Sequence, residues 1–426
     1  MSLEDYRDSM MRCFHCSLCK WVPGPYLKSW RYAYICPSIS RYKFQAYSGG
    51  GKVITALSLI LGRTEVTEEL LDIIFKCQLC GGCDLSCHLS SDLVQPLDIM
   101  RELRAKLIGE GYLIPEHSAV IDNLRKEDTM ILEGKKSERG NWAKDLDVKD
   151  LTKQPADVVF HAGCRFCYDT ELWPIARGAV TLLKNAGVDV GIMGGDEACC
   201  GGRAYEMGYQ GELIKYAEHN IETWNSAGVS KVVVACADGY ATMKNLYPTV
   251  GKKMNFEVLH ITEYLDQLIK EGKLKFTKEV PLRVTYHDPC HLGRLGDPYS
   301  PWEGEERKFT IDLTVYVPPK PSRHGMFGIY EPPRNILKSI PGVELVEMER
   351  IKEYTWCCGA GGGVKDAYPD FALWTAKERL DEAESTGAEA LVTTCPWCER
   401  NFKDAIQETG DNIKVYDIIE LIQQAI

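Results

Sequence analysis

The sequence ALVTTCPWC at residues 390–398 places two cysteines directly after a run of apolar and β-branched residues. A related stretch, KVVVACADG, occupies residues 231–239. Upstream of each, a further run ends in a cysteine: DVVFHAGC at 157–164 and PLRVTYHDPC at 281–290. Short runs of this composition are typical of buried strands. The chain therefore repeats one unit, and we predict two tandem α/β repeats with small parallel sheets.

The tripeptide Cys-Cys-Gly occurs once in each half, at residues 199–201 and 357–359. The offset between equivalent cysteines grows from 126 residues after the first strand to 158 residues at the tripeptide. The second half therefore carries an insertion, which we place at 297–328. Because α/β folds build their sites at the carboxyl ends of strands, the cysteines of each half should converge.

A second group of cysteines precedes the repeats. It comprises three cysteines with two residues between neighbours, a Cys-Pro pair, and four cysteines separated by two, two and three intervening residues. Such runs ligate 4Fe–4S clusters in bacterial ferredoxins, where the fourth cysteine of each run ligates the other cluster. Zinc sites usually use two distant pairs, so zinc or free thiols are the alternative. The predicted ligands are Cys13, Cys16, Cys19 and Cys87 for one cluster, and Cys77, Cys80, Cys83 and Cys36 for the other.

The distribution of cysteines and charge also divides the chain. The stretch from 88 to 163 holds no cysteine, and its second half is rich in Lys, Glu and Asp. The predicted fold class is α/β with an α-helical ferredoxin-like N-terminal domain. The predicted divisions are a ferredoxin-type domain at 1–112, a charged linker at 113–155, a first repeat at 156–275 and a second repeat at 276–426.

Composition excludes several function classes. The chain has 426 residues, a formal net charge of −11 and 18 cysteines. The acidic balance argues against nucleic acid or an anionic membrane as a general partner. No signal peptide begins the sequence and no apolar stretch is long enough to span a bilayer, so we expect a cytoplasmic protein that is not itself membrane-spanning. No GxGxxG motif follows a strand, so we expect no flavin or nucleotide in this chain.

The second half contains five cysteines, one more than a cubane cluster needs. Glycines follow each Cys-Cys pair and would let the main chain approach a metal centre closely. We therefore expect an unusual centre there, and a vicinal disulfide or buried free thiols are the alternative.

Three segments carry a family resemblance: YHDPCHLGR at 286–294, WCCGAGGG at 356–363 and LVTTCPWCERNF at 391–402, with DEACCGG at 196–202 as a weaker match. The chain resembles the cysteine-rich Cys-Cys-Gly family. This family includes heterodisulfide reductase catalytic subunits and the iron–sulfur subunits of glycerol-3-phosphate and glycolate dehydrogenases. It also includes heterodisulfide-reductase-like subunits of class II benzoyl-CoA reductase complexes. The order of the parts resembles the D-type subunit of heterodisulfide reductase.

The resemblance implies a noncubane 4Fe–4S cluster in each complete repeat. The second repeat would hold it on Cys290, Cys357, Cys358, Cys395 and Cys398. In the first repeat Cys164, Cys199, Cys200 and Cys236 match, but Gly239 stands at the fifth position. Cys167 is a candidate replacement for that ligand. With Cys167 as the fifth ligand, the first repeat would hold a further iron–sulfur centre; without it, the repeat would hold a different centre or none.

His287 lies three residues before the first cysteine of the second repeat. Because reduction of a disulfide consumes protons and histidine titrates near neutral pH, His287 is a candidate proton donor. A hydrogen bond to a ligand, or a core position, is the alternative.

These features predict an iron–sulfur electron-transfer subunit of a multi-subunit oxidoreductase. Two cubanes would pass electrons to or from the noncubane cluster. The alternative is a catalytic subunit that cleaves a heterodisulfide or another disulfide at that cluster, and a third hypothesis is a non-redox metal scaffold. The expected partners are a flavoprotein dehydrogenase, an electron-bifurcating flavoprotein or a membrane quinone-linked subunit.

Overall fold

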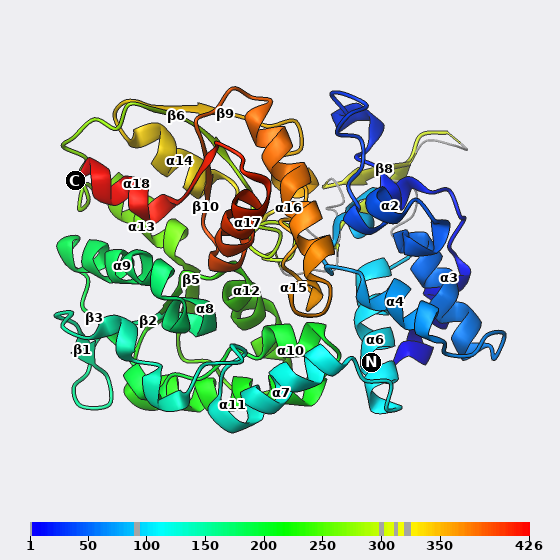
Figure 1. The fold of residues 1–426 in the computed structure, drawn as a ribbon, viewed down its shortest axis with the longest axis horizontal. Coiled ribbons are helices and arrows are strands. Elements are labelled where there is room, and N and C mark those ends of the chain that lie inside the picture. Colours follow the sequence, from blue (N-terminus) through cyan, green and yellow to red (C-terminus); the bar gives the residue numbers. More distant parts are fainter. Residues whose placement is uncertain (1, 89–93, 298–301, 311–313, 319–324) are drawn as a thin grey trace.

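The computed structural model describes residues 2–88, 94–297, 302–310, 314–318 and 325–426. Two separate parallel sheets dominate one side of the molecule, and the helical N-terminal part packs against them on the other (Figure 1). This arrangement confirms the predicted fold class. In the described ranges, no helix is both long and apolar enough to cross a membrane.

The first sheet has the strand order β1-β3-β2-β4-β5, and the second has the order β11-β10-β6-β9. Every pairing within them is parallel; for example, His161 of β2 lies opposite Val234 of β4. The strands β2, β3, β4 and β5 of the first sheet correspond to β6, β9, β10 and β11 of the second. With this match, the second order read backwards is the same as the first without β1. The strands are β1 (Lys149–Asp150), β2 (Val158–His161), β3 (Val190–Ile192), β4 (Lys231–Val234), β5 (Glu257–His260), β6 (Leu282–Tyr286), β9 (Val343–Val346), β10 (Ala390–Thr393) and β11 (Lys414–Asp417).

The helices of the repeats follow the same correspondence. Each last helix begins with a capping box, from His260 and Glu263 in α13 and from Asp417 and Glu420 in α18. Helix α9 of the first repeat packs on α18 of the second, and α14 of the second repeat packs on α13 of the first. Because α9 corresponds to α14 and α13 to α18, the same helix pair forms twice between the repeats. Their bounds are α8 (Gly163–Tyr168), α9 (Trp173–Asn185), α10 (Gly202–Glu206), α11 (Gln210–Ala227), α12 (Ala237–Ala241), α13 (Ile261–Lys270), α14 (Glu331–Ser339), α15 (Val364–Ala367), α16 (Pro369–Glu384), α17 (Pro396–Thr409) and α18 (Ile418–Ala425).

One hydrophobic core joins the two repeats. Val158 and Phe160 of β2 share it with Val284 of β6 and Val392 of β10. Gly178 of α9 lies so close to Gln423 of α18 that a Cβ atom there would come within 2.5 Å of its side chain. The repeats are therefore fixed relative to each other, with the carboxyl ends of both sheets turned toward a shared centre.

The N-terminal part is helical, as predicted, and occupies one end of the molecule (Figure 1). It is held by the core around Ile74, Phe75, Met100 and Leu103. Its helices are α1 (Arg7–Met11), α2 (Pro37–Tyr42), α3 (Gly49–Ile60), α4 (Glu68–Phe75), α5 (Gly82–His88) and α6 (Pro96–Gly109).

The range predicted as a linker, 113–155, carries regular structure. It contains α7 (Pro115–Glu127) and β1, which pairs with β3 at the edge of the first sheet. Arg139 and Trp142 in this range are buried against the first repeat. The insertion contains an antiparallel hairpin of β7 (Glu305–Lys308) and β8 (Thr314–Val317) within the described residues.

Candidate iron–sulfur sites

The five cysteines of the second repeat come together, although they arise from three strand ends. The thiol of Cys357 contacts those of Cys290 and Cys358, and Cys398 contacts both Cys358 and Cys395. All five side chains are buried. Cys395 is the N-cap residue of α17, where the positive end of the helix dipole favours a thiolate. A compact set of five buried thiols is suited to a polynuclear iron–sulfur centre.

His287 lies against this set. One ligand atom each from His287, Cys358 and Cys398 fall within 4.8 Å of one another. The Nδ1 atom accepts a hydrogen bond from Arg379 Nε at 3.2 Å, so the neutral ring carries its proton on Nε2. Burial lowers the pKa of His287. The buried ring of His287 therefore lies beside Cys358 and Cys398, and its predicted role as a proton donor stays a prediction.

Cys36, Cys77, Cys80 and Cys83 line one small cavity in the N-terminal part. The thiol of Cys80 also contacts Cys357 of the second repeat, and the two are buried in one cluster with Cys290. This contact, together with the positive charge of Arg294, lowers the pKa of Cys80 to about 6. The second predicted cysteine set therefore lies directly beside the five thiols of the second repeat.

Two buried arginines hold this junction together. Arg294 donates to the carbonyl oxygen of Cys80 at 2.9 Å and to that of Thr355 at 2.7 Å. Arg104 donates to the carbonyl oxygens of Cys77 and Gly362, both at 2.7 Å. Each guanidinium thus bridges the main chain of a predicted cluster ligand to the segment around Cys357 and Cys358. Hydrogen bonds from charged donors are the stronger ones, and here they are shielded from water.

The glycines after Cys358 serve the same junction. A Cβ atom on Gly361 would come within 2.5 Å of the carbonyl oxygen of Gln78, and one on Gly362 within 2.6 Å of that of Cys77. The sequence pattern had indicated that these glycines allow close approach to a metal centre. The structure shows that they admit the main chain of the N-terminal part.

Cys13, Cys16, Cys19 and Cys87 line a cavity of about 360 Å³. Gly50, in the first turn of α3, donates its N–H to Cys19 Sγ at 3.1 Å. Gly49 lies between this set and Cys83, because a Cβ atom there would come within 2.6 Å of Cys83 Cβ. Gly49 and Gly50, in a run of glycines that carries no phosphate-loop signature, therefore pack against both N-terminal cysteine sets.

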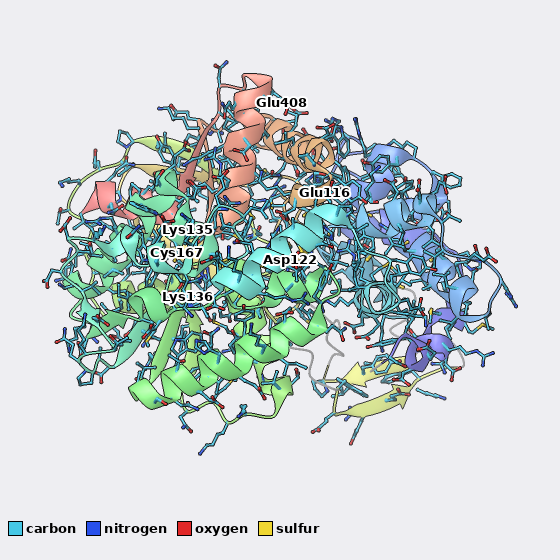
Figure 2. The ribbon with its side chains drawn as sticks, turned by 60° about the horizontal axis from the view of Figure 1, so that its bottom comes forward. Glu116, Asp122, Lys135, Lys136, Cys167 and Glu408 are labelled. Atoms are coloured by element: carbon cyan, nitrogen blue, oxygen red, sulfur yellow. The ribbon has the colours of Figure 1, made fainter. Side chains whose placement is uncertain are left out.

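The first repeat brings together fewer thiols. Cys164, Cys199, Cys200 and Cys236 line a small cavity in which Gly239 occupies the fifth position. Cys167 does not line this cavity; its thiol faces Glu197 Oε1 at 3.5 Å, and α8 places it beside the Lys135 segment (Figure 2).

A buried cation accompanies this first-repeat set. Arg139 is paired with Glu197 at 3.2 Å and lies 3.8 Å from Cys164 Sγ. A fixed positive charge beside these thiols favours their thiolate form, the form that binds metals.

The two repeats meet at equivalent cysteines. The thiols of Cys236 and Cys395 are in contact, and each follows the strand that pairs with the first strand of its repeat. Trp397 lines the cavities of both repeats, and the guanidinium of Arg203 stacks 3.8 Å above its ring. The two thiol sets therefore face each other across a shared centre.

Comparison with known proteins agrees with this arrangement. The family model described as "CCG: Cysteine-rich domain" matches twice, at residues 158–244 and 319–403. The D-type subunit of a heterodisulfide reductase from Methanosarcina acetivorans is 33% identical over 98% of this chain and 94% of its own length. Its counterpart from Methanosarcina mazei is 31% identical over the same shares. The chain belongs to the cysteine-rich CCG family and is a homologue of the D-type heterodisulfide reductase subunits.

Two further matches are a fumarate reductase subunit and a solved structure. The B-type subunit of a fumarate reductase (CoM/CoB) from Methanothermobacter marburgensis is 28% identical over 99% of this chain and 74% of its own length. A solved structure of a hypothetical protein from Helicobacter pylori has a TM-score of 0.54 at 10% identity. It covers 89% of this chain and 67% of its own, and shares the fold alone. Together the relatives identify the chain as an iron–sulfur subunit of heterodisulfide-reductase-like oxidoreductases.

One polar network in this CCG protein could not be predicted from the sequence. His291 lies 3.4 Å from Cys290 Sγ, 2.7 Å from Glu206 and 3.2 Å from Asp238. Burial alone would lower the pKa of His291, but the two carboxylates raise it well above its usual value. The network adjoins a cavity of about 190 Å³ between α6, α10 and the segment after Cys290. Only the adjacency of His291 to Cys290 in the motif was visible in the sequence.

Proposed function

We propose that this chain is an electron-relay subunit with 4Fe–4S cubanes on its two N-terminal cysteine sets and a noncubane 4Fe–4S cluster on the five thiols of the second repeat. The contact between Cys80 and Cys357 carries this proposal, because it joins an N-terminal set to the second repeat. Such clusters, when bound, supply one-electron redox chemistry.

The residues of this chain have defined roles in the relay. Cys80 and Cys357 provide a direct thiol contact between the N-terminal part and the second repeat. Arg104 and Arg294 fix that approach through the main chain. His287 lies beside Cys358 and Cys398, and the buried surroundings exclude water from the five thiols. We further propose a flavoprotein dehydrogenase, an electron-bifurcating flavoprotein or a membrane quinone-linked subunit as partner.

Iron and acid-labile sulfide per chain, on protein purified without oxygen, test the proposal. Counting four iron per cluster, we expect about 12 iron, while about 8 would leave the second repeat empty and reject the noncubane cluster. A variant that combines Cys357→Ser with Cys358→Ser should lose about four iron, one cluster's worth. The Cys167→Ser variant, altered at a buried thiol that lines no cluster cavity, is the matched control and should keep the wild-type value.

A second function is favoured by the contact between Cys236 and Cys395. Two thiol sets that face each other could act on the two sulfurs of one disulfide, and relatives carry the name heterodisulfide reductase. This function requires a loaded first repeat despite Gly239, and therefore about 16 iron per chain. If the pre-reduced protein cleaves a disulfide and the Cys236→Ser variant does not, disulfide reduction would be favoured over the electron-relay function.

A further inference from the structure

The segment around the first cysteine set has an unusual charge. Residues 9–64 contain eight of the chain's 50 Lys and Arg residues and none of its 61 Asp and Glu residues. The rest of the chain is correspondingly acidic. Figure 1 shows this segment at the end of the molecule away from the two sheets. A basic surface at one end of an acidic protein creates a directional field.

Two exposed basic residues lie in the segments that line this cavity. Arg12 lines the cavity of about 360 Å³ and is exposed. Lys43 is exposed two residues before Gln45, which also lines it. Neither Arg12 nor Lys43 forms an ion pair with a carboxylate in the described part of the chain. Within the described residues, therefore, no carboxylate neutralises their charges.

Large apolar side chains surround the same cavity. Phe14 is 74% exposed, Phe44 64%, Met11 61% and Leu18 38%. Phe14 lines the cavity itself, and Phe44 immediately precedes the lining residue Gln45. Aromatic residues, Met and Arg are enriched at protein interfaces, and a grouped set of exposed apolar side chains marks an interaction site. We call Met11, Arg12, Phe14, Leu18, Lys43 and Phe44 the basic rim.

The most accessible thiol lines the same cavity as Arg12 and Phe14 of the basic rim. Of the 18 cysteines, all of which lie in the described residues, only Cys16 is exposed. The thiols of the second repeat are buried, as is Cys80. An electron carrier of macromolecular size can therefore reach the cysteine sets most closely at Cys16.

We propose that the basic rim is the docking surface for an acidic electron-transfer protein that presents its own cofactor at its surface. The inference rests on the proposed relay function and adds the place and the charge of the partner. The positive field steers an acidic partner toward Cys16, and the apolar side chains supply a small contact area. Small, transient interfaces of this kind are typical of electron-transfer complexes.

Stopped-flow kinetics with the intact holoprotein tests this surface. The probe is the acidic flavoprotein flavodoxin in its hydroquinone form, and bleaching of the iron–sulfur absorbance reports electron uptake. The rim variant is R12E/K43E. The matched control is K253E/K414E, which makes the same change in net charge at two exposed lysines of the repeats. Methyl viologen radical, a small cationic reductant, measures cluster reduction without protein docking.

We expect the wild-type rate constant with flavodoxin to fall as ionic strength rises. R12E/K43E should be at least about tenfold slower at low salt and lose that dependence, because electrostatic steering typically contributes about 10- to 1,000-fold. K253E/K414E should stay within about twofold of wild type, as expected when steering is local. Equal rates for the two double variants would overturn the proposal.

Two further outcomes separate the alternatives. Wild-type protein that methyl viologen cannot bleach would mean that the proposed relay function itself fails. Co-sedimentation with vesicles of equal parts phosphatidylglycerol and phosphatidylcholine tests an anionic membrane as the occupant. Vesicle binding lost in R12E/K43E, combined with an unchanged flavodoxin rate in that variant, would replace the protein partner with a membrane surface.

Discussion

The thiol of Cys80, in the N-terminal part, contacts the thiol of Cys357, at the Cys-Cys-Gly turn of the second repeat. The guanidinium of Arg294 spans the same junction and is fully buried. Its Nη2 atom has no hydrogen-bond partner among the described residues, and its charge acts on Cys80, Cys290 and Cys357. Arg294 is therefore placed to influence the potentials of the clusters proposed on either side.

Replacing Arg294 with Met should make the reduction potential of the adjacent centre more negative, because a positive charge stabilises the reduced state. We expect a shift of roughly 60 mV, equivalent to a tenfold change for a one-electron couple. Arg294→Lys should shift it by less, since the charge is kept while part of the hydrogen bonding is lost. An EPR-monitored redox titration measures both. Identical potentials in wild type and Arg294→Met would contradict the assigned role.

The Gly362→Ala variant should weaken the junction between the N-terminal part and the second repeat. A Cβ atom there would come within 2.6 Å of the carbonyl oxygen of Cys77, and the residue has φ of +60°. Gly410 has φ of +75° but open space around its Cβ position, so Gly410→Ala isolates the backbone cost. We expect Gly362→Ala to cost about 1–3 kcal/mol more, as overpacking does. Denaturation midpoints under argon measure the difference, and equal midpoints would exclude a tight contact.

The Gly239→Cys variant should complete the thiol set of the first repeat. A Cβ atom at position 239 would lie 3.7 Å from Cys236 Cβ and 3.2 Å from Val234 Cγ1, so the site accepts a small side chain with slight adjustment. If the first repeat of the wild type is empty, iron per chain should rise by about four, one cluster's worth. Gly239→Ser supplies the volume without the thiol and should leave the iron content unchanged. An equal gain in both variants would show that the thiol is not what was missing.

His117 should make stability fall at mildly acidic pH. Burial lowers its pKa from 6.5 to about 4, and its Nε2 lies 2.9 Å from the carbonyl oxygen of Gly363. Between these two values the unfolded chain binds a proton that the folded chain does not, so stability decreases as pH falls below 6.5. At pH 5 the expected loss is about 2 kcal/mol relative to neutral pH.

The comparison with His117→Gln isolates this titration. Gln retains a donor for the Gly363 carbonyl oxygen but has no ionisable group. The difference in denaturation midpoint between pH 7.5 and pH 5 should therefore be smaller in the variant than in the wild type. The same pH dependence in both proteins would show that other groups, and not His117, dominate the acid response.

Local patterns predicted much of this molecule. The strands before Cys164, Cys236, Cys290 and Cys395 were visible as short β-branched runs, and their parallel pairing followed from the repeat. The role of Gly361 and Gly362 could not be predicted, because it depends on Gln78 and Cys77 in a distant segment. The regular structure of residues 113–155 could not be predicted either, because the many charged residues of this range suggest exposure although Arg139 is buried.

Local spacing was enough to predict which cysteines lie together, because those that line one cavity come from short, regularly spaced runs and from strand ends that repeat. It also determined the fold class, which follows from the periodicity of local segments. Tertiary packing alone brings Cys80 to Cys357 and Cys236 to Cys395, and leaves Cys16 as the exposed cysteine at the basic rim. Such relationships arise when distant elements pack into a shared core, and local spacing carries no information about how those elements pack.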